Sequence, residues 1–271
     1  MEWLKVTGPA FRKYVRSGNG VAVLPLGSIE KHGEHLPLGT DTLNVEYVCR
    51  EACERTGAVM LPALPYVFVN EMKASAGAVS LSAKTILAVI GEICDETSRN
   101  GIKKIVLANG HGGNNYILMT FIQDLPGRGK DYAAYLLNVY GALDEKARKK
   151  IDAMSKAKLE GGHADDGETD LTLSTWPDLV DVKAIPRRKS AGASVLDFDI
   201  SPARAQTWWY SEYPDSYAGD ARFPSRERGR IITEALVAGV ARTIEKIRND
   251  GKVARRNARF EAEARDPGKM R

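Results

Sequence analysis

Short apolar runs alternate with longer amphipathic segments along this chain, and few folds accommodate such a pattern. The apolar runs consist mostly of Val, Ile, Leu and Ala and are typical of buried strands. They lie at 21–27, 58–66, 103–110 and 131–141. Segments with a helical spacing of apolar residues lie at 41–57, 82–101, 114–125 and 226–250. Strands that alternate with helices predict an α/β protein in which helices cover both faces of a mostly parallel sheet.

Local signals predict several element boundaries. Ser82 precedes a helical segment and is a suitable N-cap, while Gly57 and Gly101 stand where two helices should end. Pro62 and Pro65 interrupt the second apolar run. Because proline donates no hydrogen bond to a sheet, we expect this strand to be short or to lie at an edge.

No linker-like stretch or internal repeat divides the sequence, so we expect a single domain over residues 1–250. The last stretch, 251–271, is polar and is predicted to form a flexible tail. A chain of 271 residues buries enough surface to fold without disulfides or a structural metal ion.

Charge and hydropathy exclude several classes of partner. The chain has 39 Lys and Arg against 35 Asp and Glu, a net charge of +4, which does not favour nucleic acid as a partner. No apolar run approaches the roughly 18 residues of a membrane span, and residues 1–20 lack the apolar core of a signal peptide. The three cysteines, at 49, 53 and 94, are expected to be reduced core thiols of a cytoplasmic protein.

The four histidines stand at 32, 35, 111 and 163. All of them lie in polar, glycine-rich stretches directly after predicted strands or at predicted helix starts. In a parallel α/β sheet, ligand sites form at the carboxyl ends of the strands. One histidine in such a place is more often structural, but four of four favour a functional site.

The richest stretch follows the first predicted strand. It contains five side chains that can bind transition metals, namely Glu30, His32, Glu34, His35 and Asp41. Imidazole and carboxylate groups together suit zinc, manganese or iron. In an extended chain Glu30 and His32 project to the same side. Asp41 stands at a helix start, where an alternative role is that of an N-terminal cap.

A second stretch, N-G-H-G-G-N at 109–114, places His111 directly after the third strand. A glycine-rich turn before a helix can also bind phosphate. The spacing fits neither the dinucleotide-binding pattern nor a P-loop, so a metal-binding histidine is the preferred interpretation.

A third stretch combines His163 and Glu168 with three aspartates, at 165, 166 and 170. The alternative interpretation is a solvated acidic helix N-terminus, which the helix dipole favours. An EF-hand loop is excluded because its D-x-D-x-D-G spacing is absent.

Taken together, these stretches resemble the creatininase (creatinine amidohydrolase) family. The matching motifs are G-S-x-E-x-H-G-x-H-L-P-L-G-T-D at 27–41, N-G-H-G-G-N at 109–114 and H-A-x-x-x-E-T at 163–169, with a further similarity at 217–229. The resemblance implies a three-layer α/β/α sandwich, a homo-oligomer that is usually a ring-like hexamer, and a site for two divalent metal ions. It also implies hydrolysis of amide-like bonds.

By motif position, the resemblance assigns the metal ligands. Glu30 and His111 bind one ion, His32 binds the other, and Asp41 bridges the two. Zn²⁺ and Mn²⁺ are the expected metals, with Fe²⁺ as a further option.

The sequence departs from the family's namesake at two places. Creatininases proper carry an acidic ligand two residues after the G-H histidine, where this chain has Gly113, and we expect Glu168 to replace it. The segment 71–79 lacks the usual His, Phe and Pro of E-H-x-x-F-P-G-T, so creatinine itself is not the expected substrate. Lys73 in that segment is a candidate contact for an acidic substrate group, or else a solvent-exposed lysine.

Two residues are predicted to support catalysis without binding metal. His163 is assigned as acid/base or substrate contact. Glu34 is expected to hydrogen-bond and orient His32 or Asp41. His35 could do the same or could be a plain structural hydrogen-bonder.

The predicted function is hydrolysis of a small cyclic amide, a formamide or a related amide by a metal-activated hydroxide. A hydrolase that opens a cyclic diketone by C–C cleavage is the alternative on the same site. An alternative of another class is a metal-stabilised scaffold or binding subunit without activity. The aromatic cluster at 208–217 is more typical of packing or a subunit contact than of a substrate cage.

Overall fold

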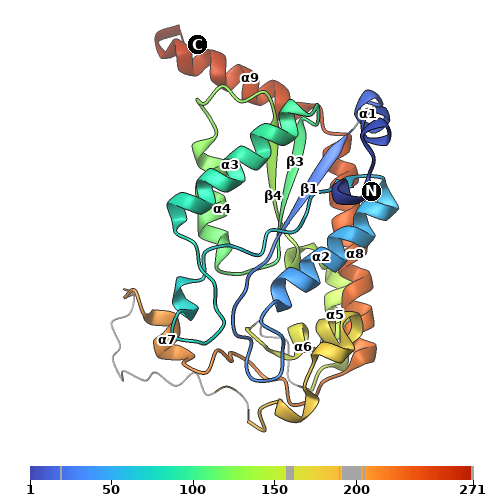
Figure 1. Cartoon of the computed structure of the whole chain (residues 1–271), viewed down its shortest axis with the longest axis vertical. Coiled ribbons are helices and arrows are strands. Elements are labelled where there is room, and N and C mark those ends of the chain that lie inside the picture. Colours follow the sequence, from blue (N-terminus) through green and yellow to red (C-terminus); the bar gives the residue numbers. More distant parts are fainter. Residues whose placement is uncertain (19, 157–161, 189, 191–202, 204, 270–271) are drawn as a thin grey trace.

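Four parallel strands form the centre of the computed structural model, which describes residues 1–18, 20–156, 162–188, 190, 203 and 205–269. The strands are β1 (Val21–Leu26), β2 (Val59–Met60), β3 (Lys104–Asn109) and β4 (Ala133–Asn138). Their order across the sheet is β2-β1-β3-β4, and every neighbouring pair is parallel (Figure 1). The carboxyl ends of all four strands therefore lie along one edge of the sheet.

The α-helices of the described residues follow in chain order. They are α1 (Gly8–Arg16), α2 (Thr40–Thr56), α3 (Ala83–Arg99), α4 (Asn114–Asp124), α5 (Glu145–Met154), α6 (Asp166–Thr175), α7 (Trp208–Glu212), α8 (Arg226–Arg248) and α9 (Lys252–Arg265).

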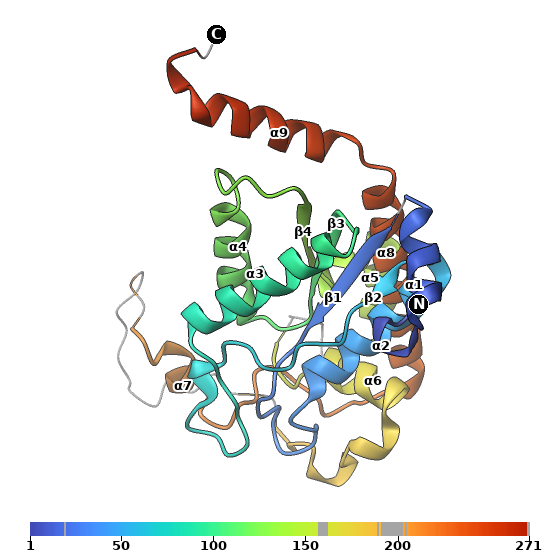
Figure 2. The same cartoon turned by 45° about the horizontal axis from the view of Figure 1, so that its top comes forward.

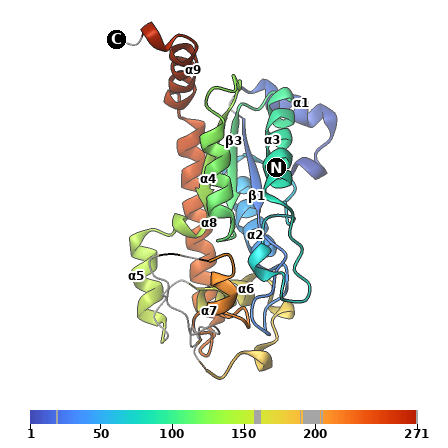
Figure 3. The ribbon, with the colours of Figure 1, turned by 90° about the vertical axis from the view of Figure 1, so that its left-hand side faces the viewer.

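Alternating residues of β1 divide the core into two layers. Val21 and Val23 pack with the apolar faces of α2 and α8, whereas Leu24 and Leu26 pack with α3 and α4. The period of two follows from the pleat of a strand, and β3 repeats it. α8 and α3 accordingly lie on opposite sides of the strands (Figure 3). The predicted three-layer α/β/α sandwich is confirmed.

The boundary signals of the sequence hold in the structure. Ser82 caps α3 by accepting a hydrogen bond from the Thr85 amide at 3.2 Å. α2 ends at Thr56, directly before Gly57. β2 has two residues and lies at the edge of the sheet, as the prolines after it predicted. The three cysteines are buried thiols without disulfides.

A buried arginine connects α6 to α8. Arg228 is 1% exposed, and its guanidinium pairs with Asp166 at 3.1 Å and with Asp170. The Ser225 amide also donates to Asp170. These two aspartates are therefore not the solvated face that the alternative interpretation suggested, because they hold α6 in place.

The segment 251–271, predicted as a flexible tail, contains the helix α9. α9 contains no buried residue and projects beyond the sheet, with the Glu261 carboxylate accepting from the Gly127 amide (Figure 2). The alanines of this segment have a high helix propensity, and its alternating charges can pair along a helix. The last two residues of the predicted tail lie outside the described residues. None of the described helices is long and apolar enough to cross a bilayer.

Candidate metal centre

The candidate site lies at the carboxyl edge of the sheet. Glu30 and His32 stand on the chain that leaves β1, His111 follows the end of β3, and Asp41 lies in the first turn of α2. All four side chains are buried, with exposed fractions between 0% and 6%. The structure thus brings together residues from three segments that the sequence places up to 81 positions apart.

The first group of possible ligands consists of Glu30, Asp41 and His111. The Nδ1 atom of His111 lies 2.8 Å from Glu30 Oε1 and 2.8 Å from Asp41 Oδ2. The Ser28 hydroxyl lies 2.9 Å from the same Asp41 oxygen and orients it. Sequence reasoning missed Ser28, although it stands inside the first motif.

The second group consists of His32, Asp41 and Glu168. His32 Nε2 lies 3.3 Å from Asp41 Oδ1 and 3.7 Å from Glu168 Oε2. The two oxygens of Asp41 therefore face two different groups of possible ligands. This is the arrangement that a carboxylate bridging two cations requires.

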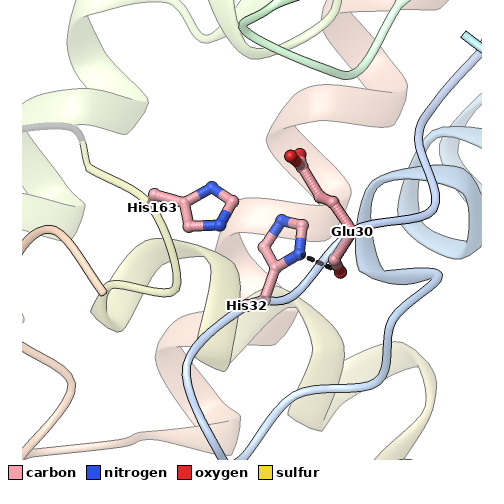
Figure 4. Close-up of side chains that lie close together, drawn as sticks. All are labelled: Glu30, His32 and His163. Atoms are coloured by element: carbon pink, nitrogen blue, oxygen red, sulfur yellow. Dashed lines mark hydrogen bonds between the residues drawn. The ribbon is translucent and has the colours of Figure 1, made fainter. Parts of the chain in front are cut away.

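His32 has a defined tautomer in this arrangement. Its Nδ1 lies 3.2 Å from the backbone carbonyl of Glu30, a contact in which the ring nitrogen must donate (Figure 4). The unprotonated nitrogen of the neutral ring is then Nε2, which faces Asp41 and Glu168. A backbone acceptor on the other ring nitrogen is the usual support of a metal-binding histidine.

His163 stacks on His32, with ring centroids 4.0 Å apart and planes inclined by 28° (Figure 4). Its Nε2 donates to the Lys31 carbonyl at 2.7 Å, so Nδ1 is the nitrogen that can exchange a proton. A two-way backbone bridge to Ala218 fixes the residue in place. His163 also belongs to a third possible ligand group, with Glu30 and His32.

Glu168 is positioned by the start of α6. The Asp165 carboxylate caps this helix by accepting from the Glu168 amide at 3.0 Å. The Glu168 carboxylate in turn accepts from the Ala164 amide at 2.7 Å. Ala164 has a φ of +57°, a left-handed conformation that is strained for alanine. The two hydrogen bonds hold Glu168 toward His32.

The electrostatics of the site favour cations. Burial disfavours the charged form of His32, but the carboxylates of Asp41 and Glu168 outweigh it and raise the pKa of His32 to about 10. The pKa of His111 is likewise well above its usual value, against burial, because of Glu30 and Asp41. The pKa of Asp41 is well below its usual range because the two imidazoles outweigh its burial. Protons therefore occupy the places that divalent cations would take.

The residues fit a pair of divalent ions. Buried nitrogen and oxygen atoms without a hydrogen-bond partner in the described part of the chain cluster here, among them Glu30 Oε2 and His32 Nε2. Unpaired buried polar atoms are costly, and a bound cation would satisfy such atoms. Imidazole and carboxylate donors suit Zn²⁺ or Mn²⁺.

Glu34 does not reach the site. Its side chain is 68% exposed and pairs with Lys31 at 2.5 Å. The expected role in orienting His32 or Asp41 therefore has no geometric basis. The reason is a turn at Gly33, whose φ of +58° ends the extended chain and directs the next side chain to the surface.

His35 is the structural hydrogen-bonder of the two alternatives. Its ring is 2% exposed, and Nε2 lies 2.8 Å from the Thr169 hydroxyl on α6. Lys73 is exposed. Part of the aromatic cluster borders the site, because the Trp209 ring lies edge-on to His163 with centroids 5.8 Å apart. Sequence reasoning placed Trp209 in a packing cluster and missed this contact.

Comparison with known proteins identifies the family. The family model described as creatinine amidohydrolase matches residues 5–244. Creatinine amidohydrolase of Pseudomonas putida is 29% identical over 254 residues, which cover 89% of this chain and 94% of that protein. The mycofactocin precursor peptide peptidase of Mycobacterium ulcerans (strain Agy99) is 26% identical over 79% of this chain and 80% of its own length.

Solved structures agree with the sequence relatives. A Zn–Zn type structure of a creatininase mutant superposes with a TM-score of 0.76 at 26% identity, covering 92% of this chain and 98% of that chain. The motifs at 27–41, 109–114 and 163–169 lie inside the matched region. This chain belongs to the creatininase family of amidohydrolases.

Proposed function

We propose that this protein is a dinuclear metal-dependent hydrolase that cleaves the C–N bond of a small amide. A cyclic amide or a formamide is the preferred substrate class. The observation that carries the proposal is the orientation of Asp41, whose two carboxylate oxygens face two separate groups of imidazole and carboxylate ligands.

The chain's own residues divide into two sets of ligands. Glu30, Asp41 and His111 would hold one ion, and His32, Asp41 and Glu168 would hold the other. Bound divalent cations supply Lewis acidity toward a carbonyl oxygen and lower the pKa of water. Three protein ligands for each ion leave positions open, as catalytic sites require.

His163 is the proposed proton carrier. Burial and the neighbouring His32 lower its pKa to about 4, so the ring is neutral near pH 7 and can accept a proton. With Nε2 fixed on the Lys31 carbonyl, Nδ1 takes the proton from water and later delivers it to the leaving nitrogen. We assign no catalytic role to Glu34.

The first test is elemental analysis of freshly purified protein that has met no chelator. The expected result is two divalent metals per chain, and protein without stoichiometric metal would overturn the proposal. The metal-loaded protein is then offered a panel of lactams, N-formyl compounds, a short peptide, a cyclic diketone and creatinine. We expect turnover of a lactam or formamide and none of creatinine. Full metal content without turnover of any amide would instead favour the scaffold.

A further inference from the structure

Glu71 lies beside the first group of ligands and takes no part in it. It belongs to a short 3-10 helix, η2 (Asn70–Met72), and its side chain is half-buried. Its carboxylate accepts a hydrogen bond from its own backbone amide, and no ion pair of this carboxylate occurs among the described residues. Burial raises the pKa of Glu71, its own backbone amide and nearby His111 lower it, and Glu30 raises it. Both ligands are thus its electrostatic neighbours.

Gly113 separates Glu71 from His111. A Cβ atom at this position would lie 2.4 Å from His111 Nε2 and 2.7 Å from Glu71 Oε1. The two atoms are consequently no more than about 5 Å apart, and both pack against Gly113 where a side chain would begin. One bridging water spans such a separation. Gly113 has helical backbone angles, φ −62° and ψ −23°, so its backbone conformation does not require glycine.

His111 needs an acceptor on this side. Its Nδ1 faces Glu30 and Asp41, and a cation bound there would leave the ring proton on Nε2. Nε2 is buried and has no hydrogen-bond partner in the described part of the chain. A buried N–H without an acceptor is destabilising. A carboxylate within one water of it removes this cost.

We propose that Glu71 accepts the Nε2 proton of His111 through a bridging water and so positions this ligand for the first metal ion. Gly113 is required because any side chain there would collide with the His111 ring and with the Glu71 carboxylate. The inference rests on the proposed metal site. It makes Glu71 a positioning residue, since it acts on the ion only through His111.

The test is a competitive zinc titration of the full chain against a chromophoric chelator. Glu71→Gln is expected to weaken the binding of one of the two zinc ions by 10–100-fold, as loss of a histidine's carboxylate partner typically does. The affinity for the other zinc ion should be unchanged. Gly113→Ala should weaken binding of the same ion, because its Cβ atom would displace the His111 ring. The control is Glu92→Gln on the exposed side of α3, with no expected change.

The outcomes separate the inference from the proposed function. Wild-type protein that binds no zinc overturns both. Wild-type protein with two zinc ions whose affinities are unaltered in Glu71→Gln overturns the inference alone. The melting curve of metal-free Glu71→Gln should match the wild type, which separates positioning of a ligand from a contribution to the fold.

Discussion

The two halves of the candidate metal centre are built differently. Glu30, Asp41 and His111 stand at the ends of central strands and at the start of a helix packed on them, and their facing atoms are 2.8 Å apart. The other half adds His32 and Glu168, with separations of 3.3 Å and 3.7 Å. Glu168 lies on α6, which packs on α8 and away from the strands.

The two halves of the centre therefore depend on different parts of the fold. The first half is held by the sheet itself, whose hydrogen bonds and core fix the strand ends. The second half depends on α6 and on the side chains that fasten it, chiefly Arg228 and His35. Substitutions near α6 should therefore release one ion, whereas only the shared Asp41 should release both.

Asp41→Asn is expected to have the largest effect. The amide keeps the shape of the side chain but loses the charge shared by both halves, so both ions should weaken by at least about 1000-fold, roughly 4 kcal/mol each. Asp41 does not cap α2, whose N-cap is Gly39. Measurement of metal content and melting temperature tests the prediction. Unchanged metal content would remove Asp41 from the ligands of both ions.

Arg228→Met should affect the fold and the second half together. The substitution leaves Asp166 and Asp170 buried without their cation, which costs about 3–5 kcal/mol of folding free energy. Because α6 carries Glu168, binding of the second ion should also weaken, while binding of the first ion is retained. Urea denaturation and zinc titration measure the two effects. Arg242→Met, which removes an exposed ion pair with Asp144, is the matched control and should cost less than about 1 kcal/mol.

Glu168→Gln should act on the second ion alone. The amide oxygen can still accept from the Ala164 amide, so α6 keeps its start, but the charge beside His32 is lost. We expect about 100-fold weaker binding of one ion, roughly 2.7 kcal/mol, and unchanged binding of the other. Zinc titration is the measurement. Retention of both affinities would remove Glu168 from the ligands and leave the second half without a third protein ligand.

The same contrast explains how much the sequence predicted. Strand ends are visible as apolar runs that stop at glycine, and for this reason Glu30, His32 and His111 could be predicted to lie at one edge of the sheet. The role of Asp41 as a shared ligand was implied by the resemblance to the family. The prediction for Glu34 was wrong because side chains alternate only along an extended chain, and the chain turns at Gly33. The partnership of Arg228 with Asp170 spans 58 residues and carries no local signal, so the aspartates looked like a solvated helix start. Contacts of α6 could not be predicted from periodicity, since they depend on tertiary packing.

The smallest expected effect concerns His35, which links the first half to α6 through the Thr169 hydroxyl. Burial, and then the positive charge of His32, lower the pKa of His35 from 6.5 to about 4. The folded protein therefore takes up this proton later than the unfolded chain as the pH falls. The stability that neutral His35 contributes is fully present above about pH 6.5 and is lost progressively between pH 6.5 and pH 4.

His35→Gln should remove this pH dependence, because glutamine can still donate to or accept from Thr169 and does not titrate. Between pH 7 and pH 5, the unfolding free energy of the wild type should fall by about 2 kcal/mol more than that of the variant. Urea denaturation of both proteins, freed of metal, measures the difference, and the carboxylates common to both cancel from it. If the two stability curves run parallel over this range, the pKa of His35 is the same in the folded protein as in the unfolded chain. The hydrogen bond between His35 and Thr169 would then hold α6 equally well whether the ring is neutral or charged.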